Sequence, residues 1–179
     1  ARDNGDTPLY IAAQLGHTDA MKLLLEYKAD VDKARNGGCT PLYIGAQKGN
    51  TGAMKLLLEH KAEVDKADDE GMTPLHFAAW YGYPLVAELL IRAGATTSLL
   101  DNWGQTALQC AQEAMSEPPE PDPNLAPSDH PGCLAVLKPP VAVLLPWRKE
   151  MATKAAFPPP FRLAVATVLR QLGPQRKVD

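Results

Sequence analysis

The sequence contains seven histidine and cysteine side chains, which can act as catalysts or metal ligands. They are His17, His60, His76 and His130, and Cys39, Cys110 and Cys133. A thiol or hydroxyl nucleophile needs a histidine and an acid arranged beside it, and no serine or cysteine here stands in such a pattern. The cysteines are irregularly spaced, so neither a disulfide framework nor a zinc site is predicted. The glycines do not follow the spacing of a phosphate-binding loop. The sequence predicts no catalytic residue, no metal and no cofactor.

Residues suited to binding another protein are easier to identify than catalytic ones. They are the aromatic side chains Trp80, Tyr81 and Trp103. Tryptophan and tyrosine are enriched at the hot spots of protein interfaces, where truncation typically costs at least about 2 kcal/mol. The elements that carry these residues decide whether they face a partner or pack inside the protein.

Those elements repeat every 33 residues. The markers are threonines and glycines, at Thr7, Thr40, Thr73 and Thr106, and at Gly5, Gly38, Gly71 and Gly104. Such a period indicates an array in which each unit buries its apolar face by stacking on the next. Within a unit, the threonine can cap a short helix and the following proline suits its first position. Gly16 ends that helix, and a second helix is predicted at about 18–27. Each unit is therefore helix, turn, helix and extended loop.

The first two units differ at only nine of 33 positions, and the apolar run is the same in both. Unit three reads Thr73-Pro74-Leu75-His76, which resembles the ankyrin signature. Units one and two have tyrosine in place of that histidine, and unit four is weaker, with Ala107-Leu108-Gln109 after its threonine. A second motif follows, as in Met21-Lys22-Leu23-Leu24-Leu25 and its copy at 54–58. The chain thus resembles the ankyrin repeat family over roughly its first two-thirds.

The resemblance implies that His76 ties the loops of adjacent repeats together by hydrogen bonds. It also implies a concave binding face, made by the turn tips and the exposed side of each first helix. Unit one supplies Asp3, Asn4, Asp6, Gln14 and Leu15, and unit two Asn36, Cys39, Gln47 and Lys48. Unit three supplies Asp69, Glu70, Met72, Trp80 and Tyr81, and unit four Asn102, Trp103, Gln105, Gln112 and Glu113.

The predicted partner-binding residues on this face are Cys39, Gln47, Lys48, Asp69, Glu70, Met72, Trp80, Tyr81, Trp103 and Gln112. Trp80, Tyr81 and Trp103 are expected to dominate. In the alternative reading, these aromatics cover the junction between unit three and the irregular fourth unit, or contact the insertion or the tail.

Two departures from the family pattern are expected to weaken the array. Unit three ends its second helix on Gly94, whereas units one and two have Lys28 and Lys61 there. A side chain in the left-handed conformation is expected to cost about 1 kcal/mol. Gly45 replaces Ala12 inside a helix, at a similar cost of about 1 kcal/mol. Unit two is therefore predicted to be the least stable full repeat.

The predicted domain organisation changes at Glu117, beyond which lie 13 of the 17 prolines. Residues 1–116 hold repeats 1–33, 34–66 and 67–99 and the start of a fourth at 100. A Pro- and acid-rich insertion at 117–131 is expected to be disordered. Residues 132–179 complete the fourth repeat and add a Pro-rich tail, with a helix near 161–172 that caps the solenoid.

Charge is unevenly distributed along the chain. Residues 1–116 hold ten basic and 15 acidic side chains, whereas 132–179 hold eight and two. An acidic solenoid is a poor binder of nucleic acid, because phosphate contacts require a basic footprint. No apolar stretch of membrane-spanning length and no secretory leader occur, so an intracellular, cytoplasmic setting is expected. The chain opens on Ala1 at a repeat boundary, as a segment of a longer protein would, and its uncapped first repeat invites self-association.

These observations predict an all-α ankyrin-repeat solenoid of three regular repeats and an interrupted fourth. Its predicted function is protein–protein interaction through the concave face, with an unidentified protein as partner and no enzymatic activity. Two alternatives stay open. One is a substrate-recognition adaptor for a ubiquitin ligase, since residues 163–173 are similar to part of a SOCS-box helix. The other is a structural spacer whose groove is occupied by its own tail.

Overall fold

The computed structural model describes residues 4–116 and 128–138. These residues form eight α-helices and no strand, which confirms the all-α prediction. The helices are α1 (Pro8–Leu15), α2 (Thr18–Glu26), α3 (Pro41–Gln47), α4 (Thr51–Glu59), α5 (Pro74–Trp80), α6 (Pro84–Arg92), α7 (Ala107–Ser116) and α8 (His130–Leu137).

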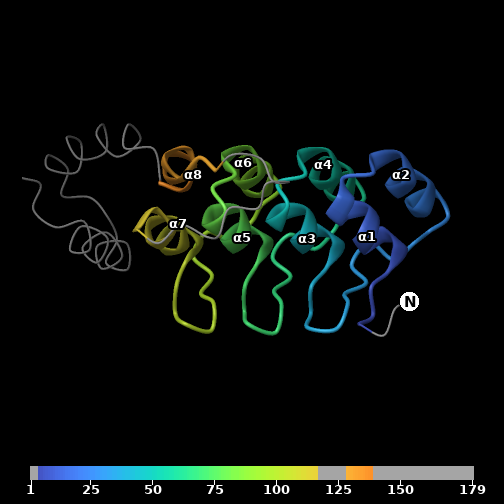
Figure 1. The fold of residues 1–179 in the computed structure, drawn as a ribbon, viewed down its shortest axis with the longest axis horizontal. Coiled ribbons are helices and arrows are strands. Elements are labelled where there is room, and N and C mark those ends of the chain that lie inside the picture. Colours follow the sequence, from blue (N-terminus) through green and yellow to red (C-terminus); the bar gives the residue numbers. More distant parts are fainter. Residues whose placement is uncertain (1–3, 117–127, 139–179) are drawn as a thin grey trace, which may run out of the picture. The chain divides into compact units, whose positions relative to one another are not determined.

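The helices form two rows (Figure 1). An inner row contains α1, α3, α5 and α7, and an outer row contains α2, α4, α6 and α8. Each unit contributes one helix to each row, and the polypeptide then descends into a hairpin loop before the next inner helix. We call these loops fingers. Their tips lie at residues 4–6, 35–39, 68–72 and 101–105 for units one to four.

The inner helices begin where the sequence predicts. Thr7, Thr40 and Thr73 have extended backbones, and each hydroxyl accepts a hydrogen bond from the backbone N–H three residues later. Proline follows each threonine, where its missing N–H costs nothing. Gly16 ends α1 at a φ of 70°, a left-handed conformation that suits a residue without a Cβ. The predicted threonine caps, and the predicted end of α1 at Gly16, are confirmed.

The fingers are joined to one another by a ladder of backbone hydrogen bonds. Asn36 N–H donates to Asn4 O at 3.1 Å, Asp69 N–H to Gly37 O at 3.1 Å, and Asn102 N–H to Glu70 O at 3.0 Å. The repeated tip glycine makes this approach possible. A Cβ on Gly38, whose φ is 78°, would lie 3.0 Å from Asp68 Cα in the next finger.

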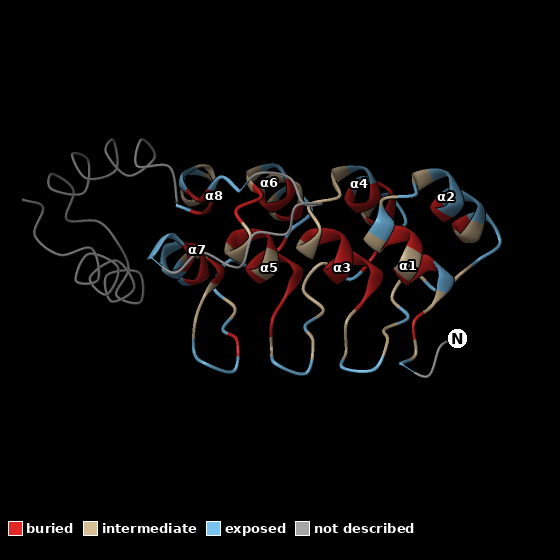
Figure 2. Ribbon diagram, in the orientation of Figure 1, coloured by how far each residue is buried: buried red, intermediate tan, exposed pale blue. Residues whose placement is uncertain are grey.

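The core lies between the two helical rows and between successive units (Figure 2). Figure 2 shows buried residues where the rows face each other and exposed residues at the finger tips. Leu42, Met54 and Leu57 of unit two are fully buried, as are Leu75 and Leu90 of unit three. Small alanines such as Ala46 and Ala79 let the helices approach closely.

The second helices of units one and two end as expected. Lys28 and Lys61 take the left-handed conformation, with φ of 59° and 62°, and are the only residues other than glycine with positive φ in the described part of the chain. The N–H of Lys61 donates to Leu58 O, and that of Gly94 makes the same bond to Ile91 O. The predicted strain is therefore present in two of the three full repeats.

The fourth unit departs from the others after its inner helix. Where the earlier units have Gly16, Gly49 and Gly82, it has Met115, and α7 accordingly continues to Ser116. Its outer helix, α8, begins at His130. The predicted insertion boundary at 131 is therefore wrong, because His130 and Pro131 already belong to the helix. The expected disorder of the insertion and the helix near 161–172 concern residues outside the described ranges, apart from 128–131.

A histidine docks α8 onto the preceding unit. The carbonyl of Trp80 can only accept, so His130 Nε2–H donates to it, at 2.9 Å. Asn50 makes the equivalent contact two units earlier, between units two and one, since its Nδ2 donates to Gln14 O at 3.0 Å. Cys133 Sγ adds a bond to Ala78 O at 3.5 Å. The interrupted unit thus retains the docking arrangement of a regular one.

Candidate functional site

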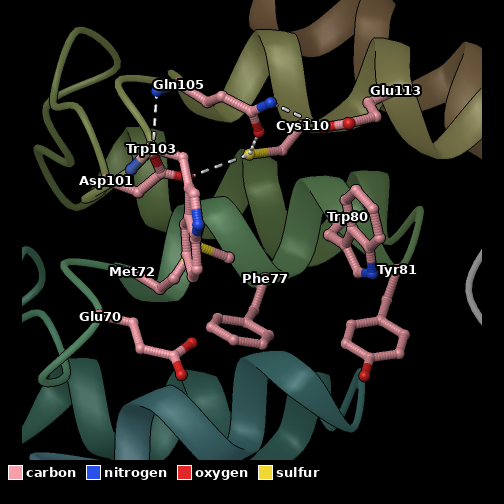
Figure 3. Close-up of a pocket in the computed structure, with 10 residues that line it drawn as sticks. All are labelled: Glu70, Met72, Phe77, Trp80, Tyr81, Asp101, Trp103, Gln105, Cys110 and Glu113. Carbon is pink, nitrogen blue, oxygen red and sulfur yellow. Dashed lines mark hydrogen bonds between the residues drawn. The ribbon is translucent and has the colours of Figure 1, made fainter.

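A groove lies between units three and four, beside the third and fourth fingers (Figure 3). Its volume is about 370 Å³. Its walls come from both fingers, from α5 and the residue that follows it, and from α7: Glu70, Met72, Phe77, Trp80, Tyr81, Asp101, Trp103, Gln105, Cys110 and Glu113.

One repeat position has a smaller side chain where it lines the groove. That position holds Ile11, Ile44, Phe77 and Cys110 in successive units. Between units two and three, the Phe77 ring packs on Tyr43, with ring centroids 4.5 Å apart. In unit four this position holds Cys110, a smaller side chain that lies buried in the wall of the groove.

Trp103 stands at the edge of the hollow on a firmly built turn. The Asp101 carboxylate accepts the backbone N–H groups of Trp103 and Gln105 at Oδ1, at 2.9 and 2.8 Å. Asp101 is only 6% exposed, whereas Trp103 is 65% exposed. The protein therefore holds a large aromatic side chain in solvent on a rigid backbone, and a surface of this kind is available to a partner.

His76 joins the third unit to the fourth finger. Its Nε2 donates to Gln105 O at 3.1 Å, while Nδ1 lies 3.2 Å from Thr73 N and 2.8 Å from Thr73 Oγ1. Because the Gln105 carbonyl can only accept, the ring proton sits on Nε2, and Nδ1 accepts from Thr73. The predicted loop-tying role of His76 is confirmed, and both ring nitrogens are occupied by it.

In the first two units, a tyrosine at the same repeat position also contacts the next finger, but through different partners. Arg35 of the second finger lies over the Tyr10 ring, 5.4 Å from its centroid, and pairs with Asp6 at 3.6 Å. Tyr43 forms side-chain hydrogen bonds with Asp68 and Cys39. Burial raises the pKa of both tyrosines, and of the Cys39 thiol, above their usual ranges.

Tyr81 belongs to a row of aromatic rings and not to the groove alone. It stacks between Phe77 and Tyr83, with centroids 6.2 Å from each. Trp80 is half-buried, and its carbonyl holds His130 of α8. Trp80 and Tyr81 therefore pack at the junction between units, as the alternative interpretation expects. Trp103 instead projects into solvent.

The groove and its rim carry negative charge. Its walls include Glu70, Asp101 and Glu113, and Glu113 accepts a hydrogen bond from Gln105 Nε2 at 2.8 Å. From residue 67 to residue 137, Arg92 is the only lysine or arginine. Arg92 lies on the outer helix α6 and pairs there with Glu88 at 2.6 Å.

The structure brings together five of the ten predicted partner-binding residues. Glu70, Met72, Trp80, Tyr81 and Trp103 line the groove, together with Gln105 and Glu113 from the wider predicted face. The other five, which are Cys39, Gln47, Lys48, Asp69 and Gln112, do not. Cys39 instead donates to Gly37 O within its own finger, at 3.7 Å. That any of these residues binds a partner stays a prediction.

Sequence reasoning missed Phe77, Asp101 and Cys110 as groove residues. Extending the 33-residue step through Ile11, Ile44 and Phe77 to Cys110 would have shown the change in size. The same step links Asp101 to Asp68, whose Oδ1 accepts two backbone N–H groups of its own finger.

Catalytic chemistry finds little support in the described residues. Burial raises the pKa of Cys110 and of Cys133 to about 12, so neither thiol is an activated nucleophile at neutral pH. In the ranges 4–116 and 128–138, no group of three or more His, Cys, Asp or Glu side chains could hold a metal ion. Nor does any helix in those ranges have the length and apolar character to cross a membrane.

A second hollow lies on the outer side of unit one, away from unit two. Its volume is about 630 Å³, and its walls are Asp6, Pro8, Ile11, Ala12, His17, Ala20, Leu23 and Leu24. The equivalent residues of unit two are covered by unit one. Leu23 is 57% exposed and its equivalent, Leu56, is 9% exposed. This hollow therefore lies on the face of unit one that corresponds to the face of unit two on which unit one stacks.

The geometry of the helical pairs and fingers agrees with the comparison to known families. The family model for ankyrin repeats, in three copies, matches residues 1–68 and 32–101. No curated protein matches the chain. On the matched residues and the two-row stack, the chain belongs to the ankyrin repeat family, whose repeats generally mediate protein–protein interaction.

Proposed function

We propose that this protein recognises a partner protein through the concave side of units three and four, with the groove beside Trp103 as the centre of contact. The observation that carries the proposal is the exposed indole of Trp103, held by Asp101 next to a hollow. Exposed aromatic side chains beside a pocket have the character of interface hot spots.

Rigidity supports this function. The finger tips are fixed by the backbone ladder, and the fourth finger is fixed further by His76 and Asp101. A surface that is already ordered loses little conformational entropy on binding, so more of the contact energy appears as affinity.

The test is capture of partners from a cell lysate by the whole chain and by two variants. Trp103→Ala removes the proposed hot spot. Leu85→Ala is the matched control, because Leu85 is equally exposed but lies on the outer helix α6. Thermal unfolding of all three proteins must agree before capture is compared.

The proposal expects a protein retained by the parent and by Leu85→Ala but lost by Trp103→Ala. If every captured protein is retained by Trp103→Ala, the groove is not the binding site. If Trp103→Ala is strongly destabilised, a Trp103→Phe variant repeats the comparison with a smaller change in packing.

We also propose self-association through the N-terminal stacking surface of unit one, which the hollow around Leu23 and Leu24 favours. Sedimentation velocity over a range of concentrations tests it. Association should weaken in Leu23→Glu and persist in Leu85→Glu, and association of equal strength in both variants would refute this surface. The adaptor alternative rests on residues 163–173, which lie outside the described ranges.

A further inference from the structure

We infer that the groove receives an arginine side chain from a basic segment of a partner protein. The guanidinium would stack on Trp103 and pair with the carboxylate of Glu70. This inference rests on the proposed function, and it names the chemistry of the partner.

Charge complementarity is the first argument. The third and fourth fingers and the adjoining helix α7 carry Asp68, Asp69, Glu70, Asp101 and Glu113. No lysine or arginine lies among them, since Arg92 is on the outer row and is already paired with Glu88. The negative field of such a surface attracts cations and repels phosphate, so a basic peptide fits and a nucleic acid does not.

The position of Glu70 is the second argument. Its backbone is fixed at both ends, because its N–H donates to Asp68 Oδ1 at 3.0 Å and its carbonyl accepts from Asn102 N–H at 3.0 Å. Among the described residues, no lysine or arginine forms an ion pair with its carboxylate. Figure 3 shows Glu70, Met72, Phe77 and the indole of Trp103 at the same end of the groove.

The combination of an aromatic face and a carboxylate that pairs with no described lysine or arginine favours arginine over lysine. A guanidinium is planar, so it can lie flat against an indole while its edge donates two hydrogen bonds to a carboxylate. The apolar stem of arginine also fits the floor, which Met72 and Phe77 form. A lysine ammonium is a compact, strongly hydrated charge that gains less from the flat wall.

The test follows the Trp103 indole N–H signal by NMR while peptides are added to the whole chain. Three acetylated and amidated five-residue peptides share a glycine and serine framework and carry arginine, lysine or citrulline at two positions. Citrulline keeps the shape of arginine without its charge. A Trp103→Phe variant assigns the signal among the three tryptophans.

The proposal expects saturable shifts with the arginine peptide and a dissociation constant in the range of about 0.1 to 1 mM. The citrulline peptide should bind at least about ten-fold more weakly, and the lysine peptide should fall between the two. Glu70→Gln should weaken arginine binding by about three- to ten-fold. Glu59→Gln removes the same charge from the outer helix α4 and should leave binding unchanged.

Several outcomes would overturn the inference. Equal binding of arginine and citrulline peptides would exclude guanidinium recognition, and equal effects of Glu70→Gln and Glu59→Gln would reduce it to general charge attraction. A Trp103 signal that moves with protein concentration would place a second copy in the groove. Absence of binding by all three peptides would also overturn the inference. If the substitution Glu70→Gln then shifts the Trp103 signal without any peptide, the groove is occupied by basic residues of the chain itself.

Failure of this inference is distinguishable from failure of the proposed function. A protein that is captured in a Trp103-dependent manner, but equally well by the parent and by Glu70→Gln, would leave the groove as the binding site and remove arginine as its ligand.

Discussion

One repeat position illustrates how this fold accepts different side chains for the same task. It holds Tyr10, Tyr43, His76 and Gln109 in the four units. Tyr10 uses Arg35, Tyr43 uses Asp68, and His76 uses the Gln105 carbonyl. In unit four the side chain of Gln109 accepts the N–H of Thr106 at 2.8 Å. The position therefore requires a hydrogen-bonding side chain, not one particular residue.

Cys133 supplies a prediction about alkaline pH. An exposed thiol ionises near 9.0, whereas burial raises the pKa of Cys133 to about 12. The unfolded chain therefore loses this proton first as the pH rises, and ionisation favours unfolding. Stability that is fully present below pH 9.0 should be lost progressively as the pH approaches about 12.

The variant that checks this is Cys133→Ser. A hydroxyl can still donate to Ala78 O, as the thiol does at 3.5 Å, but it does not ionise in this range. Urea unfolding at pH 8 and pH 10.5 should show a smaller loss of stability in Cys133→Ser than in the parent. Equal losses would mean that Cys133 does not contribute to the alkaline transition, which would then come from Cys110 and the other buried thiol and tyrosine groups.

At the scale of single elements, the ends of α2 and α4 are strained, and relieving the strain should stabilise the protein. Lys61 has a φ of 62° and is exposed. Lys61→Gly should therefore raise the free energy of unfolding by about 1 kcal/mol. Lys55→Gly is the control, because Lys55 is exposed inside α4 and the same change there should cost about 1 kcal/mol. If chemical denaturation shows that both variants are more stable than the parent, or that both are less stable, the account of strain at Lys61 is refuted.

Gly45 in α3 provides a second element-level prediction. A Cβ at Gly45 would lie 3.1 Å from Met54 Sδ, which is close, but methionine is flexible. Unit one already buries the equivalent pair, Ala12 and Met21. We expect Gly45→Ala to stabilise the protein by about 0.5 to 1 kcal/mol in urea unfolding. Destabilisation would show that Met54 is held more tightly than Met21.

At the scale of the whole molecule, stability should depend on where a residue stands in the stack. Leu23 and Leu56 lie in helices with almost the same sequence, yet one is 57% and the other 9% exposed. Leu56→Ala should cost about 2 to 5 kcal/mol, and Leu23→Ala less than about 1 kcal/mol. Both substitutions replace leucine with alanine in the same helical context, so the change in helix propensity is the same. The difference between the two losses of stability therefore measures how far the preceding unit covers each leucine. Equal losses would mean that unit one is covered by another molecule.

Much of the fold could be predicted from the sequence because the same structural signals occur in each repeat. Thr7, Thr40 and Thr73 each begin a helix, and Lys28 and Lys61 take the conformation that Gly94 takes. The start of α8 at His130 was predicted less well. Its proline stands second in the helix, and the preceding 13 residues have no counterpart in the other units.

The candidate site was predicted in part, for a physical reason. Glu70, Trp80 and Trp103 stand out by residue type and repeat position. The hollow between them depends on how the two fingers, α5 and α7 pack together, and that packing has no motif of its own in the sequence. The buried Asp101 looks like any other turn aspartate until its two N–H partners are known.

The finger ladder described above has a direction. In each step the N–H of one finger donates to the carbonyl of the finger before it, so every finger also offers an acceptor to the finger after it. In the fourth finger that acceptor is the carbonyl of Trp103, and no backbone N–H of the described residues occupies it. An extended peptide could therefore join this edge by strand addition if it brings an N–H of its own. The polarity of the ladder makes such growth possible at unit four through an acceptor.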